Sequence, residues 1–381
     1  MAQKPRSIFE EVGTTEKQEV TTGTIDAKKR GARNGIRLWL YGLFGLVVVM
    51  IVVGGLTRLT DSGLSITEWQ PVRGALPPMS ADAWDVEFEK YKQIPEYQEQ
   101  NVGMSLAEFK FIYWWEWGHR QLGRVIGLVW AIGVIGFAAT RNVPTGWMPK
   151  LLWIGALGGL QGFIGWWMVS SGLQEGMLDV ASYRLATHLG LAFVIFGFIT
   201  WYILQLSRRD ADLLQARRLG QPQLAMWGSV LIGVTFLQIL LGALVAGIDA
   251  GRSYAEWPLM AGSFFPPEPF HLSPSWRNFF ENAGTVQFMH RLTSYILIGL
   301  GIFVWTRARN SANLQTRFAF NAVLAMMFIQ MLLGIVTLIY AAPWQIAIVH
   351  QLGAVVLWVL VLRARFLAIY PLPQSVRETA A

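Results

Sequence analysis

The chain has 381 residues, of which 53% are hydrophobic and only 14% are charged. Soluble globular domains are roughly a quarter charged, so this composition indicates an integral membrane protein and excludes an ordinary soluble enzyme, a coiled coil and a disordered chain. The chain contains no cysteine, which excludes disulfides, thiolate metal sites, iron–sulfur clusters and thiol catalysis. The net charge of +7 is modest and follows from membrane topology, so no nucleic-acid partner is expected.

Eight apolar stretches are long enough to cross a bilayer, which takes ~20 helical residues. The first covers residues 38–56, and the last two share residues 318–362, where Ala341-Ala342-Pro343 divides them. The five between them are expected at residues 111–140, 151–173, 185–206, 224–248 and 286–306. None alternates apolar and polar residues as a barrel strand does. The sequence therefore predicts an all-α integral membrane protein with eight transmembrane helices.

Charge orients these helices. The N-terminal tail, the C-terminal tail and the links on their side of the membrane carry most of the 31 Lys and Arg residues, whereas the long loop 59–110 on the other side is rich in Asp and Glu. The positive-inside rule then places both termini in the cytoplasm. Residues 1–36 lack the apolar core of a signal peptide and carry acids that are unusual in mitochondrial transit peptides. We expect a multi-pass protein of the bacterial plasma (inner) membrane, surrounded by lipid.

The two halves of the chain resemble each other, with a long outer loop after the first span of each. Four spans match four spans in the same orientation, so the sequence predicts two pseudo-symmetric four-helix bundles from a parallel duplication. The matching pairs include Asp61…Trp69 with Asp249…Trp257, His119-Arg120 with His290-Arg291, and Gln161…Gly165 with Gln330…Gly334. The expected division is a cytoplasmic tail 1–36, a first bundle 37–207, a cytoplasmic linker 208–223, a second bundle 224–370 and a tail 371–381.

Four of the five histidines, His119, His188, His290 and His350, lie on the second, fourth, sixth and eighth spans. The first three lie near the outer starts of their spans, and His350 does so if the last span ends near residue 369, but lies deeper if it ends at residue 362. A lone histidine there would be a hydrogen-bonded interfacial residue, but the repeat offers two per half at similar depth. Facing imidazoles in a helix bundle are suited to hold a haem iron from both sides. Zinc fits less well, because two histidines fall short of its usual ligand number.

Charged and polar neighbours distinguish the two pairs. Arg120 and Arg291 each follow a histidine, where they would either contact haem propionates or extend to the membrane interface. Glu116 lies three residues before His119 and shares its helix face, whereas the matching residue before His290 is Gln287. A carboxyl beside a ligand can move protons, so Glu116 is the candidate catalytic residue of the first half. The alternative is an interfacial glutamate that faces water or pairs with Arg120.

These residues resemble the haem A synthase family, in its proteobacterial and mitochondrial, cysteine-free branch. The resemblance covers all eight spans and is most specific in residues 54–69 (GGLTRLTDSGLSITEW) and 116–120 (EWGHR). Thr187-His188, Met289-His290-Arg291 and Val349-His350-Gln351 complete the pattern in order. The resemblance implies oxidation of the C8 methyl of haem O to a formyl group, which gives haem A for terminal oxidases, by two hydroxylations and loss of water.

The resemblance also implies roles for the named residues. His119 and His188 would hold the substrate haem, His290 and His350 would ligate a haem b, and Glu116 would be the family's essential acid. It implies a haem O-producing enzyme as a partner. The electron acceptor stays open, with a quinone among the candidates, and Gly-rich faces such as Gly155…Gly159 leave a homo-oligomer open. The alternative function is a diheme b-type cytochrome that only transfers electrons, which does not account for Glu116 opposite Gln287. A transporter ranks last.

Overall fold

The computed structural model describes residues 24–374 of the protein. Eight helices within this range are long and apolar enough to cross a membrane, and the only β feature described is an isolated bridge between Met260 and Ser263. The expected all-α membrane fold with eight spanning helices is confirmed. The spanning helices are α1 Thr24–Leu59, α4 Leu106–Ala139, α5 Met148–Gly172, α6 Ser182–Leu206, α8 Pro222–Gly247, α11 Ala283–Ala308, α12 Leu314–Ile339 and α13 Trp344–Ile369.

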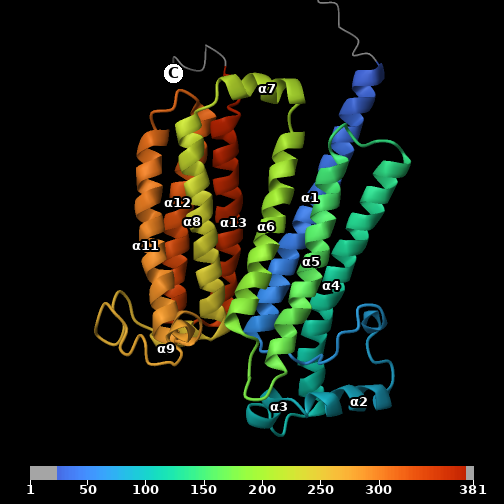
Figure 1. Cartoon of the computed structure of the whole chain (residues 1–381), viewed down its shortest axis with the longest axis vertical. Helices are drawn as coiled ribbons and strands as arrows, with labels where there is room; N and C mark the ends of the chain where they lie inside the picture. The colour runs from blue at the N-terminus through green and yellow to red at the C-terminus, as the bar shows by residue number, and fades with distance from the viewer. Residues whose placement is uncertain (1–23, 375–381) are drawn as a thin grey trace, which may run out of the picture.

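The long helices run side by side along the molecule (Figure 1). α1 packs on α4 and α6, and α5 packs on α6, whereas α8, α11, α12 and α13 pack among themselves. α6 contacts α8 and α13, and α1 contacts α13, so these helices join the two sets. The short helix α7 (Asp210–Arg218) connects α6 to α8 at one end of the molecule, and α2 (Ala81–Tyr91), α3 (Pro95–Glu99) and α9 (Ala250–Ser253) lie at the other (Figure 1). The pseudo-symmetric division and the domain boundaries stay predictions.

The long loop after α1 is more structured than an extended segment. Ser80 caps α2 by accepting a hydrogen bond from the Ala83 amide, and Trp84, Phe88 and Tyr91 are buried at helical spacing. α4 begins at residue 106, five residues before the expected start, because Ser105 and Glu108 form a capping box. The sequence carried both capping signals, although the expectation rested on hydropathy alone. The loop is therefore a folded cover over the outer end of α4.

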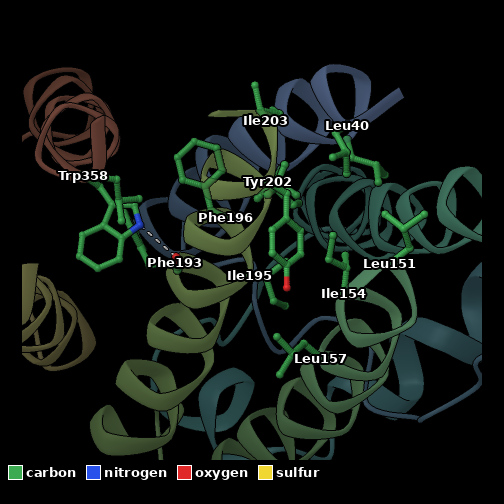
Figure 2. Packing of buried hydrophobic residues seen from close by; sticks show 14 of the residues in the cluster. Leu40, Leu151, Ile154, Leu157, Phe193, Ile195, Phe196, Tyr202, Ile203 and Trp358 are labelled. Carbon is green, nitrogen blue, oxygen red and sulfur yellow. Dashed lines mark hydrogen bonds between the residues drawn. The ribbon is translucent and has the colours of Figure 1, made fainter. Parts of the chain in front are cut away.

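The core around α6 connects the two sets of helices. Phe193 and Phe196 of α6, Leu40 of α1 and Leu151 of α5 are buried members of one cluster (Figure 2). Trp358 of α13 packs against the same cluster, and its indole Nε1 donates to the Phe193 carbonyl over 3.1 Å. This contact fixes α13, which also carries His350, against α6 of the first half of the chain.

Candidate functional site

The four histidines form two pairs in the structure. His119 of α4 lies near His188 of α6, and His290 of α11 lies near His350 of α13. All four side chains lie within the membrane-spanning helices. α13 extends to Ile369, so His350 lies near the start of its helix as His188 and His290 do. The structure thus brings together the two pairs that the sequence predicted.

Each histidine ring lies against a glycine of another spanning helix. A Cβ added to Gly54 would stand 3.1 Å from Nε2 of His119. The glycines let each ring approach the neighbouring backbone, which a larger side chain would prevent. At the other three positions the nearest ring atom is Cε1, at 3.0 Å for Gly165 and His188, 3.1 Å for Gly242 and His290, and 3.0 Å for Gly334 and His350.

Three of the four histidines each have a glutamine as a hydrogen-bond partner. The glutamine lies four residues before the glycine and donates Nε2–H to the backbone carbonyl of the histidine. The pairs are Gln161 with His188 at 3.0 Å, Gln238 with His290 at 3.1 Å and Gln330 with His350 at 2.7 Å. Sequence reasoning found the first and third of these glutamines as a repeat but missed Gln238, although the same four-residue spacing to glycine was present.

Glu116 is buried, with 3% of its surface exposed. Its Oε2 accepts hydrogen bonds from Ser65 Oγ and the Ile66 amide, both at 2.7 Å, and its Oε1 accepts from Arg120 Nη2 at 2.6 Å and Nε at 3.1 Å. The carboxylate therefore ties α4 to the start of the outer loop. The pairing with Arg120, which the sequence left as the alternative, is present.

Gln287 occupies the matching place in α11. Its Nε2 donates to the Ala250 carbonyl at 2.7 Å, and its Oε1 accepts from Arg291 Nη2 at 2.8 Å. Arg291 is buried and also donates to the carbonyls of Tyr254 and Leu259, each at 3.0 Å. Arg291 therefore holds the loop that follows α8.

Arg120 makes equivalent hydrogen bonds to the loop of the first half: it donates to the carbonyls of Ile66 at 2.7 Å and Glu68 at 2.9 Å. A polar hollow of about 170 Å³ opens beside it, between the outer loop and α4. Arg124 and Trp117 line the same hollow. Three arginines (Arg73, Arg120 and Arg124) and two glutamates (Glu68 and Glu87) line it, so it offers guanidinium donors beside carboxylates.

A second buried carboxyl, Glu96 of α3, lies near this region and escaped the sequence analysis. Its side chain is 3% exposed, and its Oε2 has no hydrogen-bond partner. Burial, together with the nearby carboxylates of Asp179 and Glu116, raises the pKa of Glu96 to about 8. No motif marks Glu96, since it lies in a polar loop whose burial depends on how α3 packs.

A charge cluster at the ends of α1 and α8 was also missed. Arg58 contacts Asp61 at 2.7 Å, Asp249 at 2.9 Å and Asp179 at 3.5 Å. Asp61 and Asp249 both adopt a left-handed conformation with φ of 49°, as their matching places after α1 and α8 would suggest. One arginine of the first half thus binds an aspartate of the second.

Comparisons with known proteins agree with this architecture. Residues 37–362 match a family model described as cytochrome oxidase assembly protein. A protein of Ruegeria sp. strain TM1040 named Heme A synthase is 62% identical over 376 residues, which cover 98% of this chain and 99% of the relative. A protein of the same name from Dinoroseobacter shibae is 61% identical over 381 residues, which cover 99% of this chain and 100% of the relative. Another from Cereibacter sphaeroides strain ATCC 17029 is 57% identical over 388 residues, which cover 99% of this chain and 99% of the relative. The chain belongs to the haem A synthase family of cytochrome oxidase assembly proteins.

Proposed function

We propose that this protein is a membrane-bound oxidoreductase that converts haem O to haem A. The observation that carries the proposal is the identity of about 60% with relatives named Heme A synthase over nearly the whole of both chains. Eight spanning helices place the reaction in the membrane, as an apolar porphyrin substrate requires. The proposed change is the oxidation of the C8 methyl group to a formyl group.

The two histidine pairs would hold two haems. His119 and His188 would hold the substrate haem in the first half, and His290 and His350 would hold a resident haem b in the second. The fit is supported by buried atoms that lack a partner beside the rings, which are Oε1 of Gln161, Gln238 and Gln330 and Nδ1 of His350. When bound, haem iron supplies electron-transfer and oxygen chemistry. The chain supplies the ligands and their orientation.

Glu116 would handle protons at the first site. Oxidation of a methyl carbon releases protons, and Glu116 is the acidic side chain on the same helix face as His119. Its bonds to Ser65 and Arg120 keep the carboxylate in place beside the first site. Gln287 has no such capacity, which suits a site that only transfers electrons.

Arg120 and Arg291 would bind haem propionates. The hollow beside Arg120 and Arg124 supports this for the first site. In the second half, Arg291 keeps a buried Nε with no partner, which is a free donor for a carboxylate. Each arginine would then join a propionate to the outer loop that covers its site.

The proposed setting is the bacterial inner membrane with both termini in the cytoplasm. The first residues of α1 and the last residues of α13 lie at the same end of the molecule as α7 (Figure 1). This arrangement is compatible with both termini on one side of the membrane. An enzyme that produces haem O would supply the substrate. The electron acceptor would be a membrane-soluble carrier such as a quinone.

The test uses a host that makes haem O and lacks its own haem A synthase. Expression of the wild-type chain is expected to give haem A, measured by chromatography of extracted pigment. Glu116→Gln is expected to lower haem A at least 100-fold while the reduced-minus-oxidised spectrum keeps the haem b of the second site. Full haem A production by this variant would contradict the role of Glu116, and absence of haem A with the wild-type chain would contradict the function.

A further inference from the structure

The loop between α9 and α11 contains an apolar segment, residues 257–267 (WPLMAGSFFPP), which carries no charged side chain. An exposed apolar patch on a folded protein marks contact with a partner or with a membrane. The position of the segment on α11 decides between the two. Its large side chains are 41–54% exposed at Trp257, Leu259, Phe264 and Phe265.

The apolar segment lies along the side of a membrane span. The rings of Phe264 and Phe265 pack on Phe288 of α11, with centroid distances of 5.9 and 4.9 Å. Two turns further along α11, the Tyr295 hydroxyl accepts a hydrogen bond from Trp257 Nε1 over 2.9 Å. Figure 1 shows the loop between α9 and α11 extending sideways from the end of α11. The loop is therefore folded against the helix and not only attached to its end.

These contacts place the segment at the depth of the hydrocarbon core. Arg307, a charged residue in the last turn of α11, marks one boundary of that core. Tyr295 and Phe288 precede Arg307 by 12 and 19 residues, which correspond to about 18 and 28 Å of helix. The core is about 30 Å thick. Phe264 and Phe265 therefore lie near the opposite boundary, and Trp257 lies inside the core.

The backbone of the segment is suited to such a place. Irregular backbone is tolerated at membrane depth only where its polar groups find partners within the protein. The prolines at 258, 266 and 267 carry no N–H group that would need a partner. Other polar groups are paired, as Arg291 with the Leu259 carbonyl at 3.0 Å, Met260 with Ser263 at 2.6 and 3.1 Å, and Glu256 with the Gly262 amide at 3.0 Å.

We propose that the apolar segment enters the membrane leaflet on the side of α9 and that its exposed side chains contact lipid. Lipid is the occupant because the part of α11 that the segment covers is itself a candidate membrane span, which a water-soluble partner does not reach. Tryptophan is favoured where headgroups meet acyl chains. The segment thereby anchors the loop that Arg291 holds.

The loop after α1 has the opposite chemistry. Together with α4 it encloses the polar hollow beside Arg120, and the lining of that hollow includes Glu68 and Glu87. Charged groups are costly to place in hydrocarbon, so this loop faces water. The two halves therefore differ in what covers them, which is a polar loop beside Arg120 and a lipid-anchored loop beside Arg291.

The experiment measures the membrane depth of single spin labels. The chain contains no cysteine, so a nitroxide can be attached to one introduced cysteine at a time. Phe264→Cys is the test position, Glu89→Cys on α2 is the control in water, and Ile329→Cys on α12 is the control in lipid, since both side chains are exposed. The full-length protein is reconstituted in vesicles of phosphatidylcholine and phosphatidylglycerol, and its thermal midpoint reports whether each variant has folded.

Power saturation compares collisions of the label with oxygen, which concentrates in hydrocarbon, and with a nickel chelate, which stays in water. The ratio of oxygen to nickel collisions at Phe264→Cys is expected to exceed that at Glu89→Cys about tenfold, because a polar chelate is excluded from hydrocarbon. It should approach the ratio at Ile329→Cys. Leu259→Cys gives a second position if the Phe264 variant does not fold.

Two results would overturn the proposal. A ratio at Phe264→Cys or Leu259→Cys equal to that at Glu89→Cys would place the segment in water. Few collisions with both reagents, at a position that is exposed in the single chain, would show that another protein or a second copy covers the segment in place of lipid.

Discussion

Glu116 and Gln287 occupy matching places on α4 and α11. The neighbours of each side chain match the hydrogen-bond donors and acceptors that it carries. Glu116 faces donors, which are the Ser65 hydroxyl and the Ile66 amide. Gln287 donates to the Ala250 carbonyl and accepts only from Arg291. An exchange of the two side chains would set an amide N–H against the Ile66 N–H in one half and a carboxylate against a carbonyl in the other. The local backbone has therefore adapted to each residue.

The buried carboxyl of Glu96 predicts that the stability of the folded protein depends on pH. Its pKa of about 8 lies above the ordinary value of 4.5, so the folded protein binds a proton that the unfolded chain releases between these values. Stability contributed by the protonated form is then lost as the pH rises from about 4.5 to 8. Asp179 and Asp61, together with Glu116 of α4, are the carboxylates that act on it.

Glu96→Gln should remove this dependence. We expect the variant to melt at higher temperature than the wild type at pH 8 and at nearly the same temperature at pH 5, measured by thermal unfolding in detergent. Glu99→Gln on the same short helix is the control, since Glu99 is exposed. A wild-type melting temperature that stays constant between pH 5 and 8 would refute the buried-acid account of Glu96.

Contacts between tryptophan and glycine connect the helices. In each case the indole Nε1 donates to a carbonyl of a neighbouring helix and the ring covers the glycine four residues later. Small residues allow such close approach between helices in a membrane, where hydrophobic burial drives little association. The three cases are Trp39 with Val129 and Gly133 at 3.0 Å, Trp130 with Leu151 and Gly155 at 2.9 Å, and Trp358 with Phe193 and Gly197 at 3.1 Å.

Gly155→Ala tests this arrangement. A Cβ at this position would overlap the ring of Trp130, so the variant should lose about 1–3 kcal/mol of stability, as overpacked cores do. Gly159→Ala is the matched control on the same helix, because its added Cβ meets nothing within 4 Å. The thermal midpoint should fall for the first variant and not for the second. Equal midpoints would show that α4 and α5 are not held by this contact.

The two sets of helices are joined at both polar and apolar contacts. Gln351, which follows His350, donates to the Ile51 carbonyl of α1 at 2.6 Å, and its side chain lies against Gly55. Gly54, which immediately precedes Gly55 on α1, lies against His119. One turn of α1 therefore touches the surroundings of both histidine pairs.

Arg58 provides the test of this junction. Its side chain is 13% exposed, and its aspartate partners are 36–51% exposed, so its loss should cost about 1–2 kcal/mol, between the values for surface and buried pairs. Arg58→Gln should lower the thermal midpoint and speed limited proteolysis near residues 175–181. Lys92→Gln, which removes the exposed pair with Glu89, should change neither. No difference between the two variants would contradict a role of Arg58 in joining the halves.

The sequence alone determined the spans, the helices that carry the four histidines and the contrast between Glu116 and Gln287. These features are local, because they depend on hydropathy along the chain and on spacing along one helix. The start of α4 was misplaced by five residues because hydropathy does not register a capping box outside the membrane. The helices α2 and α7 were missed for a similar reason, since both lie in polar segments.

Only the tertiary structure decided which side chains meet across helices. It brought His119 to His188 and His290 to His350, buried Glu96, and joined Arg58 to Asp249. It also showed that Gln161, Gln238 and Gln330, each four places before a glycine, donate to the backbone carbonyl of a histidine on another helix. Such contacts join residues that are far apart in the chain, and their geometry depends on how whole helices pack, which no local pattern of sequence determines.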